Sequence, residues 1–204
     1  MRKTCNFMIK PVLAGKNVVL RPFEKRDCET MYEILNEPDL KKLTGSVSSD
    51  EEAYAMTQPE EKEKIQQWYL TRNEQDKRLD LAIVSKESNQ AIGEVVFNEY
   101  EEDTANVNFR MLLSEASCNK GIGTEALNMF IQYGMEELKL HKISLEVFSF
   151  NPRAERVYQK AGFKLEGIKR EAFIYNQEYI DIKIYGMLQT DYLDKKLGMQ
   201  AAQK

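Results

Sequence analysis

The chain contains few of the residues on which metal and triad chemistry usually depends. Its 204 residues include one histidine, His141, and three cysteines, Cys5, Cys28 and Cys118. Three scattered cysteines form neither a disulfide framework nor zinc-site spacing, and one histidine removes most histidine-based metal sites and triads. We therefore expect no metal, and we expect any acid–base chemistry to use other residues.

Long apolar runs and an excess of positive charge are also absent. No segment has the ~20 apolar residues that cross a bilayer. Lys10 and Pro11 interrupt the amino-terminal segment before a signal-peptide core can form. Charged residues make up 30% of the chain, both signs are interspersed, and the formal net charge is −4. This pattern is typical of a soluble surface and argues against a nucleic-acid or membrane partner. We expect a cytoplasmic protein with one main domain.

The spacing of apolar residues predicts a mixed α/β fold. Period-two alternation predicts strands at 17–23, 79–85, 91–100, 105–113 and 142–150, and two more in 163–188 joined through Asn176 and Gln177. Helices are predicted from Asp27, as the cap, to Leu35, after Pro59, after Gly123, from Pro152 to Lys160 and from Asp191. Residues 45–57 show little periodicity and are expected to form a loop. Antiparallel strands followed by strand–helix units favour a mixed α/β sandwich over a doubly wound sheet.

Residues 118–130 (CNKGIGTEALNMF) form the most informative motif. Gly121 and Gly123 permit backbone dihedrals that are closed to other residues, so amide groups can converge on a phosphate at the start of a helix. Alone, such a motif is more often a plain loop-to-helix junction. It lacks the Gly-Lys-Ser/Thr ending of a P-loop and the third glycine of a dinucleotide fold. Support comes from residues 151–163 (NPRAERVYQKAGF), which follow a strand-like run.

Taken together, CNKGIGTEAL, SLEVFSF, NPRAERVYQKAGF and FIYNQEYIDIKIYGML resemble the GNAT superfamily of acetyl-CoA-dependent N-acetyltransferases. The chain looks most similar to the branch of the ribosomal-protein N-terminal acetyltransferases RimJ and RimL and the bacterial spermidine acetyltransferases. LRPFEKRD and LNEPDL also resemble the opening of that branch. The resemblance implies a mostly antiparallel sheet with helices on both faces and a splayed central strand pair. It also implies an extension at 1–16, an N-acetyltransferase domain at 17–193 and a tail at 194–204.

The resemblance assigns cofactor roles residue by residue. The diphosphate loop corresponds to Cys118, Asn119, Lys120, Gly121, Ile122, Gly123 and Thr124. The family has Arg or Gln where this chain has Cys118, and commonly Gly where it has Asn119. Asn tolerates positive φ, so the backbone course is expected to persist, and Lys120 is a candidate to replace the lost side-chain donor. The pantetheine arm is expected along Met111, Leu112 and Leu113, with Asn151 as a further cofactor ligand.

The implied reaction is direct attack of a primary amine on acetyl-CoA. By the resemblance Tyr158 lies near the sulfur, and a phenol is a reasonable proton donor to a leaving thiolate. Glu94 and Glu146 lie on predicted central strands and are the candidate bases, although a salt-linked carboxylate on an open sheet face explains either equally well. A backbone N–H of Leu112 or its neighbour is expected to bind the oxyanion.

The acceptor is expected to contact residues 31–45, residues 45–57 and the hairpin at 175–179. Acidic residues there favour a cationic amine or a basic peptide terminus, although a solvated acidic surface is the commoner explanation: Glu33, Glu37, Asp39, Asp50, Glu51, Glu52 and Glu178. A peptide or protein N-terminal amine is favoured, with a polyamine, an amino acid or an amine antibiotic left open. A homodimer is expected. The change at Cys118 motivates a second hypothesis, a non-catalytic sensor or interaction module that binds acetyl-CoA or CoA.

Overall fold

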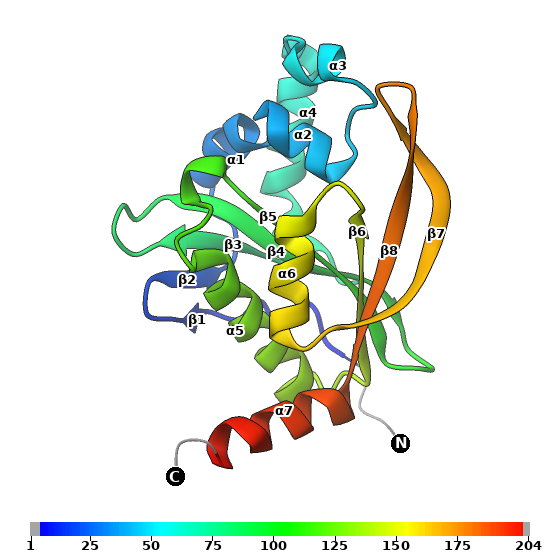
Figure 1. Ribbon diagram of the computed structural model, residues 1–204. Coiled ribbons are helices and arrows are strands. Elements are labelled where there is room, and N and C mark those ends of the chain that lie inside the picture. The colour runs from blue at the N-terminus through cyan, green and yellow to red at the C-terminus, as the bar shows by residue number, and fades with distance from the viewer. Residues whose placement is uncertain (1–4, 202–204) are drawn as a thin grey trace.

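The computed structural model describes residues 5–201 (Figure 1). Within these residues, eight strands form one sheet in the spatial order β1-β2-β3-β4-β5-β6-β8-β7. The strands are β1 Leu13–Ala14, β2 Val18–Arg21, β3 Leu79–Ser85, β4 Ala91–Glu101, β5 Asn106–Leu113, β6 Lys142–Phe148, β7 Lys164–Tyr175 and β8 Glu178–Leu188. All neighbouring strands run antiparallel except β5 and β6, which are parallel.

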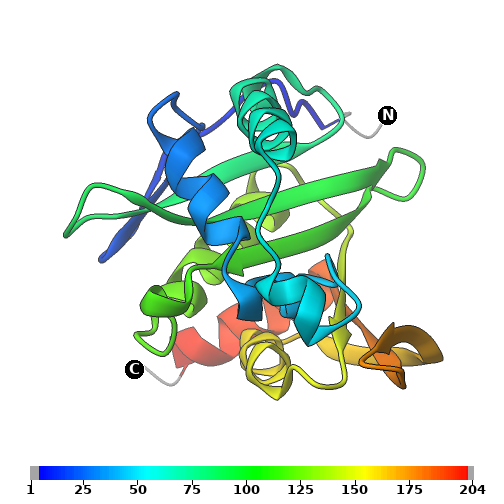
Figure 2. The same cartoon turned by 90° about the horizontal axis from the view of Figure 1, so that it is seen from above.

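Helices cover both faces of this sheet (Figures 1 and 2). They are α1 Asp27–Leu35, α2 Pro38–Thr44, α3 Asp50–Tyr54, α4 Pro59–Leu70, α5 Ile122–Glu136, α6 Pro152–Ala161 and α7 Gln189–Ala201, with 3-10 turns η1 Arg72–Glu74 and η2 Glu115–Ser117. Side chains of a strand alternate between the two faces. Leu81 of β3 belongs to the core cluster that includes Phe130 of α5, whereas Ala82 belongs to the cluster that includes Met31 of α1 and Tyr69 of α4. The predicted mixed α/β architecture is confirmed.

The two central strands β5 and β6 separate after a short parallel stretch. Their pairing covers only residues 106–108 against 142–144, although β5 continues to Leu113 and β6 to Phe148. On their outer sides both strands stay paired, β5 with β4 and β6 with β8. The predicted splayed pair is therefore confirmed, and it leaves a gap between the two halves of the sheet.

The first helix begins differently from the prediction. The prediction makes Asp27 its cap, but α1 starts at Asp27, with Arg26 at the cap position and no side-chain cap hydrogen bond. Instead, the Asp27 carboxylate accepts hydrogen bonds of 2.6 and 2.9 Å from Arg21 and of 2.7 Å from the Glu24 N–H. The acidic residue at the start of this helix therefore forms a buried ion pair and is not a cap.

The segment predicted to be a loop at 45–57 contains the short helix α3. Ser49 caps it, because its hydroxyl accepts a 3.2 Å hydrogen bond from the Glu52 N–H. A five-residue helix covers little more than one turn, so it leaves no readable apolar period. The tip of the β7–β8 hairpin lies beside this segment (Figure 1), where the Asn176 N–H donates to the Ser48 carbonyl at 2.9 Å.

Both ends of the described chain pack on this fold. Phe7 is buried in the core and meets Tyr100 edge to face, with ring centroids 5.4 Å apart. The expected tail boundary at 193/194 falls inside α7, which runs on to Ala201. The predicted domain limits at residues 17 and 193 stay a prediction. Of the helices within residues 5–201, none is long and apolar enough to cross a membrane.

Candidate active site

A cavity of about 640 Å³ lies where β5 and β6 separate. One wall is β5 from Asn108 to Leu113, and the other is β6 from Glu146 to Phe148. The remaining walls come mainly from the start of α5, from α6 and from α2. Beyond residue 108 the β6-facing edge of β5 has no strand paired with it, so its backbone groups are available to an extended ligand.

The glycine motif forms the turn at the start of α5. Gly121 has a φ of +77° and Asn119 has a φ of +60°, so the predicted positive φ at Asn119 is confirmed. Gly123 differs from the prediction, because it lies in the first turn of the helix and has no positive φ. α5 begins without a side-chain cap, which leaves its first amide N–H groups open to an anion. The turn is therefore suited to a diphosphate.

Cys118 lies at the edge of this turn and is partly buried. Its thiol donates to the Ser114 carbonyl at 3.4 Å, and burial raises its pKa while Arg153 opposes that effect. A raised thiol pKa gives no support for a redox or nucleophilic role. Arg153 is in the first turn of α6 and lines the cavity, whereas Lys120 is exposed and is not among the lining residues. The geometry favours Arg153 over Lys120 as the cation near the turn.

Arg153→Ala is expected to weaken CoA binding roughly fivefold, about 1 kcal/mol, because an exposed guanidinium contributes modestly to phosphate binding. Lys120→Ala is the matched control and should change the Kd by less than about twofold. Calorimetric titration of CoA measures both. A weaker Kd for Lys120→Ala with an unchanged Kd for Arg153→Ala would reverse the assignment.

Tyr158 of α6 lines the same cavity. It is 7% exposed, and its ring packs edge to face against Phe109 and Phe163 at centroid distances of 6.3 and 6.0 Å. Burial raises its pKa to about 12. The hydroxyl therefore stays protonated at any ordinary working pH and can donate a hydrogen bond to a ligand in the cavity.

Asn151 caps α6 at the same wall. Its side-chain oxygen accepts a 3.1 Å hydrogen bond from the Ala154 N–H, which explains why an Asn-Pro pair begins this helix. Asn151 also lines the cavity. Its structural role is therefore compatible with a ligand contact through the side-chain amide hydrogens.

The two candidate bases lie in opposite environments. Glu94 on β4 is 8% exposed, lines the cavity and has a raised pKa, chiefly through burial. Glu146 on β6 also lines the cavity, but it is exposed and forms an ion pair with Lys169 of β7. A buried carboxylate with a raised pKa is the better proton acceptor near neutral pH.

Two of the expected acceptor segments meet at the tip of the β7–β8 hairpin. Tyr175 donates a 2.6 Å hydrogen bond to Asp50, and the Asn176 amide donates one of 2.7 Å to the other carboxylate oxygen. These bonds hold the pKa of Asp50 below its usual value. Lys42 lies over the Tyr175 ring, 4.6 Å from its centre. The Asp50 carboxylate thus stays ionised and is held in place by hydrogen bonds within the chain.

The structure brings most of the predicted site residues to one cavity. Those that line it are Glu94, Met111, Leu112, Leu113, Cys118, Asn119, Gly121, Gly123, Thr124, Glu146, Asn151 and Tyr158. Lys120 and Ile122 are not among the lining residues. Arg153 is not predicted from the sequence, because its only signal is a cation in the first turn of a helix, where the helix dipole disfavours positive charge. Within residues 5–201, no group of three His, Cys, Asp or Glu side chains is arranged to hold a metal ion.

Comparisons with known proteins agree with this geometry. Residues 17–164 match the family model described as an acetyltransferase (GNAT) domain. The chain is 29% identical over 182 residues to the probable N-acetyltransferase YjcK of Bacillus subtilis, covering 88% of this chain and 98% of that protein. It is 31% identical over 113 residues to spermidine N(1)-acetyltransferase of Vibrio cholerae, covering 55% and 65% of the two chains. A solved structure of spermidine N-acetyltransferase from Vibrio cholerae, in complex with CoA and spermine, has a TM-score of 0.75 at 23% identity, covering 88% and 99%. At that identity the structural likeness shows the fold.

Proposed function

Because the chain belongs to the GNAT family of acetyl-CoA-dependent N-acetyltransferases, we propose that it acetylates the primary amine of a peptide or protein N-terminus, or of a small amine, by direct attack. The observation that supports the assignment of roles is one cavity lined by Glu94, Tyr158 and the α5 turn. In this proposal the turn and Arg153 bind the diphosphate, and the free edge of β5 from Met111 to Leu113 binds the pantetheine arm.

In the proposed mechanism, Glu94 accepts a proton from the acceptor ammonium, and the free amine attacks the thioester carbonyl. A backbone N–H of a residue next to Leu112, on the free edge of β5, binds the oxyanion of the tetrahedral intermediate. The carbon–sulfur bond then breaks, and Tyr158 donates its proton to the departing sulfur. The nitrogen loses its second proton to solvent, Tyr158 regains a proton from solvent, and Glu94 releases its proton to solvent, so that one proton is released per turnover. Glu94 pairs with Leu112 across the β4–β5 ladder, so the residues on either side of Leu112 place their amides on the free edge near the proposed base.

We propose a peptide N-terminus over a polyamine because several acidic side chains of the acceptor segments already form hydrogen bonds within the chain. Asp50 accepts hydrogen bonds from the hairpin, and Glu52 accepts them from Ser48. Glu37 likewise accepts a 2.8 Å hydrogen bond from the Glu115 N–H. Lys42 adds positive charge beside the hairpin. These carboxylates stay negatively charged, but part of their hydrogen-bonding capacity is already used within the chain.

The acceptor assignment is tested by following thiol release from acetyl-CoA with matched acceptors. We expect the highest kcat/KM with a peptide that has a free N-terminus, and no release with the same peptide blocked at its N-terminus. Spermidine and free amino acids are expected to be at least roughly tenfold poorer, a difference of about 1.4 kcal/mol. Preference for spermidine would contradict the acceptor. If the protein binds CoA but releases no thiol from acetyl-CoA with any of the amines, the result would favour a sensor.

We further propose that the enzyme is cytoplasmic and dimeric and that residues 17–193 form its catalytic domain. The edge strand β7 supports the dimer, since it is 12 residues long and exposes Leu165, Ile168 and Ile174. Light scattering of the purified chain measures the mass in solution, and a mass of one chain would contradict the dimer.

A further inference from the structure

Glu94 lies between the cavity and a buried cluster of charged side chains formed by Arg72, Arg78 and Asp80. Its Oε2 has no hydrogen-bond partner among the described residues, and Nη2 of Arg72 lies 3.8 Å from it. That distance allows a charge interaction but no hydrogen bond. The carboxylate is therefore influenced by the charge of Arg72, and its Oε2 has hydrogen-bonding capacity that the described residues leave unused.

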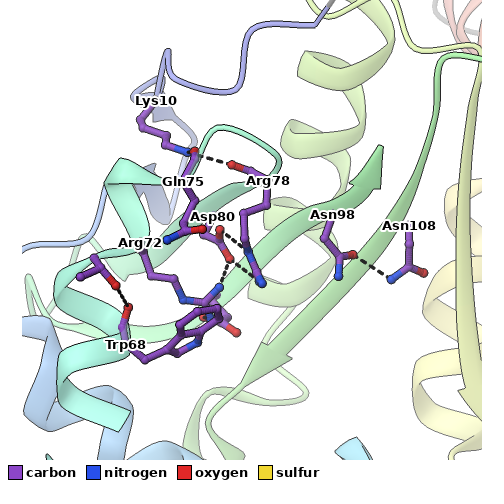
Figure 3. Close-up of polar contacts among 10 residues, drawn as sticks. Lys10, Trp68, Arg72, Gln75, Arg78, Asp80, Asn98 and Asn108 are labelled. Carbon is purple, nitrogen blue, oxygen red and sulfur yellow. Dashed lines mark hydrogen bonds and ion pairs between the residues drawn. The ribbon is translucent and has the colours of Figure 1, made fainter. Parts of the chain in front are cut away.

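Arg72 is held in place by its other contacts (Figure 3). It is 4% exposed, its Nη1 donates a hydrogen bond to Asp80, and its guanidinium lies 4.2 Å from the centre of the Trp68 ring. Asp80 has no exposed surface and also accepts two 2.8 Å hydrogen bonds from Arg78. The guanidinium of Arg72 thus has a fixed position relative to Glu94.

The charges of these four side chains balance only when Glu94 is ionised. Arg72 and Arg78 contribute positive charges, and Asp80 contributes a negative charge. Buried charges without compensation are costly, so the cluster favours a second carboxylate. Burial of Glu94 favours its neutral form instead. The two effects oppose each other at a group that lines the cavity.

We infer that Arg72 and Asp80 are positioning residues that orient the Glu94 carboxylate and set the pH range over which it accepts a proton. The inference rests on the proposed role of Glu94 as the base. Arg72 favours the ionised carboxylate, and Asp80 opposes it both directly and by engaging the Arg72 guanidinium. The pair therefore gives the Glu94 carboxylate a tendency to ionise that lies between two limits. One limit is a carboxylate whose charge is fully balanced by Arg72, and the other is a buried acid with no cation nearby.

Other groups also face Glu94. Tyr69 of α4 and Arg110 of β5 also interact with Glu94, and both favour its ionised form. Burial raises the pKa of Glu94 most, Arg72 lowers it and Asp80 raises it. Removing the charge of Arg72 must then raise this pKa, and removing the charge of Asp80 must lower it. A role confined to packing would not predict opposite signs.

The test is the pH profile of kcat at saturating acetyl-CoA and acceptor, because its acidic limb reports the base in the enzyme–substrate complex. Asp80→Asn keeps the side-chain shape, and the midpoint of its acidic limb should lie roughly one pH unit below that of the wild type. Arg72→Met keeps an apolar stem, and the midpoint of its acidic limb should lie roughly one pH unit above that of the wild type. The matched controls are Glu74→Gln and Lys77→Met, both at exposed positions, and their limbs should stay in place.

Opposite shifts of the two variants support the inference. Limbs that stay in place or move in the same direction overturn it. Thermal melts show whether each variant is folded. If Arg72→Met does not fold, a downward shift of the acidic limb in Asp80→Asn supports the inference, and an unchanged limb overturns it. Wild-type kcat in Glu94→Gln would overturn the base assignment itself. Loss of kcat in Glu94→Gln with an unmoved Asp80→Asn limb would overturn only the inference.

Discussion

Tyr158→Phe is expected to lower kcat by roughly 10²- to 10⁴-fold, while the Kd for CoA stays within about twofold of the wild type. The substitution removes only a hydroxyl from a side chain that lines the cavity. A thiolate leaves when the tetrahedral intermediate collapses, and a donor at the sulfur stabilises that charge in the transition state more than it stabilises bound acetyl-CoA. Thiol release gives kcat, and calorimetry gives the Kd.

The fold should survive this substitution, because the phenyl ring keeps the packing against Phe109 and Phe163. Equal losses in kcat and in CoA affinity would show that Tyr158 binds the cofactor and does not act in the chemical step. The wild-type enzyme supplies a second check. With the pKa of Tyr158 raised to about 12, this group should cause no alkaline fall in kcat below about pH 10.

Local patterns in the sequence predict the framework because they depend on neighbouring residues alone. The period-two pattern in residues 79–85 indicates a strand, and its apolar side chains are divided between the two core clusters. The positive φ at Asn119 and the end of α6 at Gly162, where φ is +103°, follow from which residues tolerate that conformation. Short elements such as β1 and α3 escape prediction because they are too short to show a period.

Tertiary contacts between distant charges are not predictable in the same way. Arg72, Asp80 and Glu94 lie on three separate elements, and nothing in the local sequence around each one pairs it with the others. Only the packing of η1 against β3 and β4 places them together in the interior. The same limit applies to Arg153 and Cys118, which are brought together by the approach of α6 to the α5 turn. The choice between the two candidate bases therefore depends on burial, which sequence alone does not give.

Glu94→Gln is expected to lower kcat by roughly 10²- to 10³-fold near neutral pH, whereas Glu146→Gln should lower it by less than about threefold. The two substitutions are chemically identical and both carboxylates line the cavity, so they form a matched pair. They differ because Glu94 is buried with a raised pKa, while Glu146 is exposed and paired with Lys169. Initial rates of thiol release with a peptide acceptor measure both.

The loss in Glu94→Gln should shrink as the pH rises above the pKa of the acceptor. A peptide amino group has a pKa of about 8, so near pH 9 most of it is already the free amine and needs no base before attack. The kcat of the wild type rises less over the same pH range, because its base is already ionised once the pH exceeds the pKa of Glu94. A deficit that stays constant across this range would contradict proton removal by Glu94. A larger loss in Glu146→Gln than in Glu94→Gln would move the base to β6.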